Sequence, residues 1–141
     1  MKSIKRTIPF IIMAAFVLTA CGAPNTSLDA TSWHLESYRD AGDNMVDVLP
    51  DSVSTVLFQA DHLSGSAGCN NYSTSYETNG ASISFGPVAN TLKSCETPEG
   101  IMQQETAFLM ALSSAKIYAM DRGSLVLKDE QGEVLLTFVK R

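Results

Sequence analysis

Clusters of basic residues are missing from most of this chain. Acidic residues outnumber basic ones by 15 to 10, which gives a formal net charge of −5, and no Lys/Arg cluster occurs beyond the first six residues. Because nucleic-acid-binding surfaces contact phosphates through Lys and Arg, we expect no nucleic acid partner. Aromatic residues (8%) and cysteines (three) are also few. The 141 residues, with 45% hydrophobic content, suit one globular domain and exclude a collagen-like or disordered chain.

Common catalytic and cofactor motifs are missing too. The sequence contains no Gly-x-Ser-x-Gly elbow, Walker loop, Gly-x-Gly-x-x-Gly or His-Glu-x-x-His. His34 and His62 have no ligand-like spacing, and neither Cys69 nor Cys95 has a second cysteine at Cys-x-x-Cys spacing, so we predict no metal site and no cofactor. Asp61 and His62 are adjacent, which in a strand would direct them to opposite faces. We therefore expect that the protein is not an enzyme.

The N-terminal segment is typical of an export signal. Residues 1–7 carry three basic side chains, and residues 8–20 carry no charge but fall short of the roughly 20 apolar residues that span a bilayer. The sequence Leu18-Thr19-Ala20-Cys21 resembles the lipobox of bacterial lipoproteins, in which Cys21 receives diacylglycerol before cleavage. We predict a lipoprotein signal peptide over residues 1–20; an ordinary secretory signal with a chance cysteine is the alternative.

The predicted mature chain would be held to a membrane by its acyl chains. Without residues 1–20 it has 7 basic and 15 acidic residues, a formal charge of −8, which does not attract anionic lipid. Palmitate-like chains on Cys21 would supply the attachment, and residues 21–30, with their small and polar side chains, are predicted as the tether. Gly22 follows the cysteine where some lipoproteins have Asp; similarity to Gram-negative lipoproteins favours the outer membrane, on its periplasmic face.

The remaining cysteines, Cys69 and Cys95, can form one intramolecular disulfide. In an oxidising compartment this bond would persist, and closing its 27-residue loop would stabilise the fold by about 3.5 kcal/mol on a chain-entropy estimate. Two buried free thiols are the alternative.

Period-two alternation predicts strands through most of residues 31–141. In the first strand, Trp33, Leu35 and Ser37 fall on one side. Asn79-Gly80 predicts a tight hairpin, and turns at residues 121–123 and 129–132 predict a C-terminal three-stranded meander. The predicted strands are residues 32–38, 53–59, 72–78, 82–85, 116–120, 125–128 and 134–139.

One helix is predicted, with Thr97 as its cap, Pro98 at its first helical position, and an end at Ser114. Its apolar stripe contains Ile101, Phe108 and Leu112, and it also contains Glu105. A buried carboxylate is costly without hydrogen bonds. We expect Glu105 to accept hydrogen bonds from backbone amides or from Thr91 and to fix the helix on the sheet; a general acid is the alternative.

Taken together, these residues resemble the META domain, as found in the HslJ heat-shock lipoproteins. The resemblance covers residues 31–141 and rests on residues that recur in order, although Lys93-Ser94 stands where many members have Met-Ala. It implies an α+β, mostly antiparallel fold: a small barrel-like sheet, closed or open on one side, with one helix packed on it. It assigns no catalytic residues, and we interpret Gly68 and Asn70 as turn residues. The residues that carry the motif are Trp33, Gly68, Asn70, Tyr72, Thr91, Glu105, Phe108 and Leu112.

Two function classes remain open. The family association with envelope stress favours a lipoprotein that acts in stress response or envelope assembly by binding an envelope protein. A lysozyme-inhibitor-type lipoprotein is another candidate of this class. The second class is a carrier or sensor of a small hydrophobic ligand within the barrel. An apolar pocket between helix and sheet would favour the carrier, whereas a filled core would argue against it.

Overall fold

Strands make up most of the fold in the computed structural model, which describes residues 27–140. The predicted signal peptide (residues 1–20), Cys21 and the first part of the predicted tether lie outside the described residues. The described elements are β1 (Thr31–Arg39), β2 (Met45–Asp47), β3 (Thr55–Gln59), β4 (His62–Ser66), β5 (Asn71–Asn79), β6 (Ser82–Phe85), β7 (Ala89–Asn90), α1 (Ile101–Ser114), β8 (Ile117–Asp121), β9 (Ser124–Lys128) and β10 (Val134–Val139).

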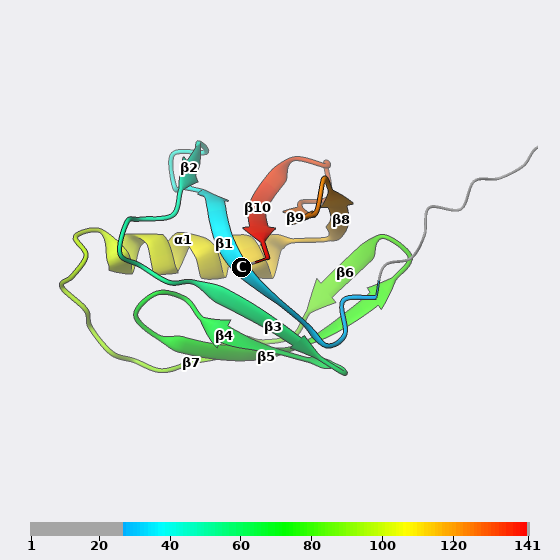
Figure 1. Cartoon of the computed structure of the whole chain (residues 1–141), viewed down its shortest axis with the longest axis horizontal. Helices are drawn as coiled ribbons and strands as arrows, with labels where there is room; N and C mark the ends of the chain where they lie inside the picture. The colour runs from blue at the N-terminus through cyan, green and yellow to red at the C-terminus, as the bar shows by residue number, and fades with distance from the viewer. Residues whose placement is uncertain (1–26, 141) are drawn as a thin grey trace, which may run out of the picture.

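The strands form one antiparallel sheet that closes into an uneven ring (Figure 1). Neighbours follow in the order β10-β9-β8-β6-β5-β4-β3-β1, and β1 also pairs with β10. The pairing between β6 and β8 is limited to the single residue pair Ser82↔Ile117. β2 pairs with the end of β1, and β7 pairs with β5. The predicted fold class, a mostly antiparallel barrel-like sheet with one helix, is confirmed.

The helix closes over a filled core. α1 lies against β1, β10 and β6, and its Phe108 is fully buried. The Phe108 ring makes edge-to-face contacts with Tyr72 of β5 and Phe138 of β10, at centroid distances of 5.4 and 6.3 Å. Trp33 and Leu112 are also almost completely buried. The hydrophobic effect therefore joins α1 to strands from both halves of the ring.

The first strand departs from strict alternation. Trp33 and Leu35 face the core as expected, but Tyr38, rather than Ser37, is the next buried side chain. The pairing of β1 with β10 shifts register between Leu35 and Ser37. Such a β-bulge inserts an extra residue, which reverses the facing of the residues after it. Tyr38 thereby reaches the same side of the sheet as α1.

The predicted hairpin is present, shifted by one residue. Asn79 still pairs with Ser82, so the two loop residues are Gly80 and Ala81. Gly80 has φ +61°, a left-handed conformation that glycine adopts without a steric penalty. The C-terminal meander of β8, β9 and β10 is confirmed.

The helix begins later than predicted. Thr97 does not cap it: α1 starts at Ile101, preceded by Gly100 with φ +88°, and it has no side-chain cap. A residue with positive φ cannot continue a right-handed helix, so residues 97–99, including Pro98, form a turn before it. The N–H of Ile101 donates to the Pro98 carbonyl at 3.1 Å. The helix ends at Ser114, as expected.

The described end of the predicted tether packs on the fold. Leu28 is 3% exposed and belongs to the core, and the Thr31 N–H donates to its carbonyl. The carboxylate of Asp29 accepts a hydrogen bond from the Ala60 N–H at 2.6 Å. The chain is thus fixed to the sheet from Leu28 onward.

Candidate functional site

The carboxylate of Glu105 lies on the inward side of α1, 4% exposed, against the turn between β4 and β5. Its Oε2 accepts hydrogen bonds from the backbone N–H groups of Cys69 (3.2 Å) and Asn70 (2.7 Å). Its Oε1 accepts from the side-chain Nδ2 of Asn70 at 2.6 Å. The Thr91 hydroxyl, one of the partners expected for Glu105, instead donates to Oδ1 of Asn70 at 2.7 Å. Glu105 therefore accepts hydrogen bonds from backbone amides, as expected. The Asn70 side chain lies between Glu105 and Thr91 and bonds to both.

Asn70 joins three separate segments. Its Oδ1 also accepts from the Lys93 N–H at 2.7 Å, and its Nδ2 donates to the Lys93 carbonyl at 3.0 Å. The sequence suggested a local turn role for Asn70, but most of its side-chain bonds reach residues more than 20 positions away. The side chain thus connects the β4–β5 turn to the loop before α1 and to α1 itself.

The predicted disulfide between Cys69 and Cys95 is present and reinforces this cluster, with a Cα–Cα distance of 5.9 Å. Cys69 is buried, and Gly68 beside it has φ +120°. Glycine adopts this conformation without the strain that other residues would meet, and a Cβ at Gly68 would lie 2.7 Å from Cδ1 of Ile101, whose side chain would have to shift. The cluster therefore holds the start of α1 against the β4–β5 turn.

Chemically, this cluster is saturated. The donors around Glu105 belong to the chain itself, and the carboxylate is buried beneath them. Asp61 and His62 do not point to opposite faces: their side chains approach to 3.4 Å, because Asp61 lies in the turn before β4 rather than in the strand. Both are highly exposed, at 87% and 69% of the side chain. Glu105 lies against an open hollow beside Thr106 and Leu109, but its carboxylate already accepts hydrogen bonds from the chain's own donors.

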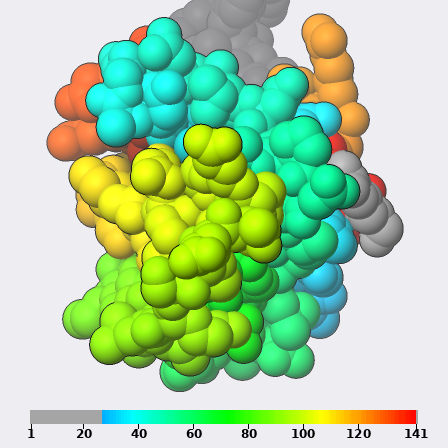
Figure 2. All heavy atoms as spheres, turned by 90° about the vertical axis from the view of Figure 1, so that its left-hand side faces the viewer, coloured from blue at the N-terminus to red at the C-terminus, as the bar shows by residue number. Residues whose placement is uncertain are grey.

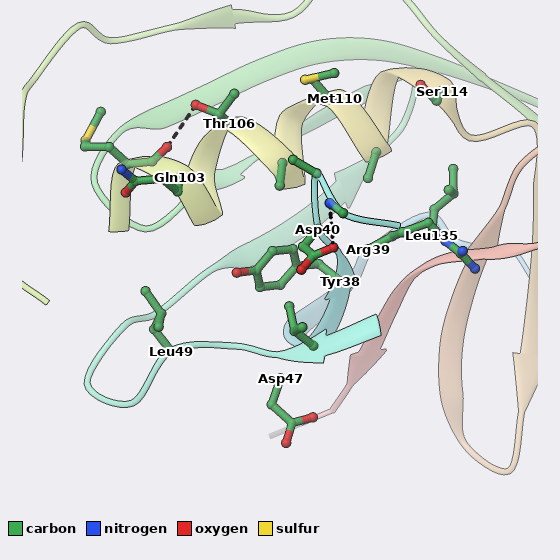
Figure 3. Close-up of a pocket in the computed structure, with 16 residues that line it drawn as sticks. Tyr38, Arg39, Asp40, Asp47, Leu49, Gln103, Thr106, Met110, Ser114 and Leu135 are labelled. Atoms are coloured by element: carbon green, nitrogen blue, oxygen red, sulfur yellow. Dashed lines mark hydrogen bonds between the residues drawn. The ribbon is translucent and has the colours of Figure 1, made fainter. Parts of the chain in front are cut away.

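A groove that the sequence did not predict lies on the other side of α1 (Figure 3). Its volume is about 820 Å³, and it runs between α1 and the segment that contains the end of β1, β2 and the following loop. Figure 2 shows this segment, in cyan, next to the yellow helix on one face of the molecule. The apolar lining is made of Tyr38, Val46, Leu49, Met102, Ala107, Met110, Ala111 and Leu135.

The helix side of the groove carries no charge. Across Ile101–Ser114 the one ionisable side chain is Glu105, which points inward. Thr106, Met110 and Ser114 follow one another along one edge of the helix (Figure 3), and Met110 is 66% exposed. A solvent-facing helix surface normally carries charged residues. An uncharged, partly apolar surface next to a groove is typical of a contact site.

Carboxylates stand on the opposite side of the groove. Asp40 lines it, and Asp43 follows in the same loop. Asp47 stands at its edge: Asp47 pairs with Ser37 and Val46 with Tyr38, so the Asp47 side chain lies on the face of β2 away from Tyr38. The lining cation, Arg39, is bound within the domain: Nε donates to the Val134 carbonyl at 2.8 Å, Nη1 to Asp43 at 3.0 Å, and Nη2 lies 3.7 Å from Glu133. Burial, and to a lesser degree the charge of Asp40, raises the pKa of Tyr38. The potential on this side is therefore negative.

The described part of the chain offers neither a cluster of metal-ligating side chains nor a membrane-spanning helix. Within residues 27–140, no set of three or more His, Cys, Asp or Glu side chains is placed to hold a metal ion. In the same range, no helix combines the length and apolar character needed to cross a membrane.

The fold and cluster define a class of small domains: an antiparallel strand ring with one helix fixed to it through a buried carboxylate. The chain belongs to the META domain family, whose model matches residues 26–141. An NMR structure of a Burkholderia xenovorans protein is similar, with 29% identity, a TM-score of 0.66, and coverage of 81% of this chain and 83% of that one. A crystal structure of a DUF4847 family protein from Bacteroides vulgatus shares the fold, with 17% identity, a TM-score of 0.58, and coverage of 81% and 94%. No curated protein matched the chain significantly.

Proposed function

We propose that this chain is a non-catalytic, lipid-anchored META-domain protein of the outer membrane that binds a partner protein of the envelope in the groove beside α1. The observation that carries the binding role is the exposed, uncharged face of α1 next to an apolar groove. In this role the protein would act in envelope stress response or envelope assembly.

The anchor is supported by the lipobox-like sequence that ends at Cys21 and by the disulfide, which suits an oxidising compartment. The groove is also well placed for a tethered domain. Leu28 and Thr31 lie at the start of β1, whereas Tyr38 and Arg39 line the groove at its end. At about 3.3 Å per residue, the two ends of β1 lie about 25 Å apart. The groove would then open away from the anchored end.

We propose no catalytic role because Glu105 and Arg39 already bind other groups of the chain. Glu105 accepts hydrogen bonds from the chain's own donors, and Arg39 is held by Val134, Asp43 and Glu133. A general acid must reach the substrate, and a buried, saturated carboxylate does not.

Photo-crosslinking in the intact envelope tests the binding role. A photoreactive amino acid replaces Met110, and the control carries it at Met120, which is 36% exposed on β8 and away from the groove. We expect a discrete protein adduct of reproducible mass from position 110 and none from position 120. Equal adducts from both positions, or none from position 110, would refute the proposal. Cys21→Ser should release the chain from the membrane; a variant that stays membrane-bound at the normal mature mass would refute the anchor.

The second candidate, a carrier of a small hydrophobic molecule, is favoured by the apolar lining of the same groove. The filled ring interior argues against the version in which the ligand sits inside the barrel. Native mass spectrometry of the exported chain carrying Cys21→Ser distinguishes the two candidates. A co-purified lipid-sized mass that is lost in Met110→Lys would favour the carrier, and a bare chain would favour the partner protein.

A further inference from the structure

The two sides of the groove impose different requirements on an occupant. The α1 side offers methionine and alanine side chains without charge, so it matches an apolar surface. Methionine is flexible and polarisable, which lets it adapt to varied apolar partners. An occupant therefore needs a continuous apolar stripe.

The opposite side needs positive charge. Asp40 lines the groove, Asp47 stands at its edge, and Asp43 and Glu133 are 83% and 70% exposed near it. Arg39 does not satisfy them all, because its side chain is only 19% exposed and already bonds to a backbone carbonyl. An anionic occupant would be repelled here, whereas Lys or Arg side chains would find exposed carboxylates.

The length of the groove matches a helix. Its α1 lining extends from Met102 to Ser114, about 18 Å at 1.5 Å per residue. A partner helix of about 12 residues, or three turns, would cover that distance. Grooves with an apolar floor bind amphipathic helices through anchors spaced at i, i+3, i+4 and i+7.

We propose that the occupant of the groove is a basic amphipathic helix of a partner protein, with its apolar stripe against α1 and its Lys or Arg residues toward Asp40 and, at the edge of the groove, Asp47. This inference rests on the proposed binding function and adds the chemistry of the partner.

Synthetic peptides test this directly. The protein is the full-length chain carrying Cys21→Ser, and the probe is a fluorescently labelled 14-residue Leu/Lys peptide with helical spacing of its leucines. Its counterparts are a Leu/Glu peptide of the same pattern and a Leu/Lys peptide interrupted by proline. At low salt we expect the Leu/Lys helix to bind about tenfold or more tightly than either counterpart, as measured by fluorescence anisotropy.

Two variants locate the binding. Asp40→Asn combined with Asp47→Asn should weaken Leu/Lys binding by about tenfold and flatten its salt dependence. Asparagine keeps the oxygen with which Asp40 accepts the N–H groups of Gly42 and Asn44, so the loop should persist. The matched control, Glu77→Gln combined with Glu130→Gln, removes the same charge from exposed positions outside the groove and should leave binding unchanged.

Met110→Lys should abolish binding of the Leu/Lys peptide, whereas Met120→Lys should not. Equal binding of the Leu/Glu peptide, or unchanged binding in Met110→Lys, would overturn the inference.

Vesicles containing phosphatidylglycerol serve as a further probe: if they bind and Met110→Lys releases them, the groove recognises lipid and the inference is wrong. If the Leu/Lys peptide does not bind but position 110 still forms a protein adduct in the envelope, the basic-helix inference is refuted and the proposed binding function stands. Peptide binding without any adduct in the envelope would refute the proposed function instead.

Discussion

The inward and outward faces of α1 reverse the usual arrangement of a surface helix. The inward face holds its one ionisable side chain, Glu105, at 4% exposure with three hydrogen bonds. The outward face exposes Met110 at 66% and carries no charge. Surface helices usually place charge outward and apolar groups inward. Here the charge organises the loops beneath the helix, and the surface left uncharged is the one next to the groove.

Glu105→Ala is the largest expected perturbation of the inward face. It would leave two backbone N–H groups and the Asn70 amide without their buried acceptor, and each such donor costs about 1–3 kcal/mol. We expect the free energy of unfolding to fall by about 4 kcal/mol in urea titrations. Gln103→Ala, an exposed position on the same helix, should change it by less than about 0.5 kcal/mol. Similar losses in both variants would contradict the contrast between the faces.

Removal of the disulfide should have the next largest effect. In a Cys69→Ala/Cys95→Ala variant we expect a loss of about 3.5 kcal/mol from the greater chain entropy of the unfolded state. The measurements are the free energy of unfolding and the photo-crosslinking from position 110, because position 110 reports on the groove, which lies on the other face of α1. An unchanged unfolding free energy would show that the Glu105 cluster alone holds the loop before α1.

Tyr72 makes a smaller, pH-dependent contribution to the free energy of unfolding. Its hydroxyl donates to the Thr55 carbonyl at 2.9 Å, and burial raises its pKa well above the usual value near 10. Native Tyr72 stays protonated while the unfolded side chain ionises, so its contribution is complete below about pH 10 and declines at higher pH. The decline reaches about 1.4 kcal/mol at pH 11.

Tyr72→Phe isolates the pH-dependent stabilisation by the Tyr72 hydroxyl, because the other titrating groups are common to both chains. At pH 7 the variant should be less stable by about 1 kcal/mol, the value of one hydrogen bond. At pH 11 the two chains should be nearly equal in urea titrations. A stability difference that does not change between these pH values would contradict a neutral, buried Tyr72.

Much of the inward face could be predicted from the sequence. Local patterns marked the strands and the end of α1, the position of Glu105 within an apolar stripe marked it as unusual, and the two remaining cysteines permitted one pairing. The sequence did not predict features that depend on the backbone conformation of a single residue or on contacts between distant residues. The positive φ of Gly100 delays the helix, and the bulge after Leu35 turns Tyr38 inward. Apolar periodicity, on which the strand and helix predictions rest, signals neither feature.

The groove could not be predicted because its sides are far apart in the sequence. Val46 and Leu49 belong to a three-residue strand and its loop, too short for a periodic signal, and they meet Met102 and Met110 across more than 50 residues. One signal was available: a 14-residue helix with a single charge, already assigned to the interior, has an uncharged surface. That pattern identifies the face of α1 but not the segment opposite it.

Met110→Lys is the smallest expected perturbation of stability and the sharpest test of the contrast. The side chain is exposed and the substitution keeps a good helix former, so the unfolding free energy should change by less than about 0.5 kcal/mol. The same substitution should remove the crosslinked adduct formed by a photoreactive residue at Thr106, four positions earlier on the helix and also lining the groove. Glu105→Ala, measured at a temperature where it remains folded, should keep that adduct. If instead Met110→Lys unfolds the chain, or Glu105→Ala removes the adduct while folded, the two faces of α1 do not divide stability from binding.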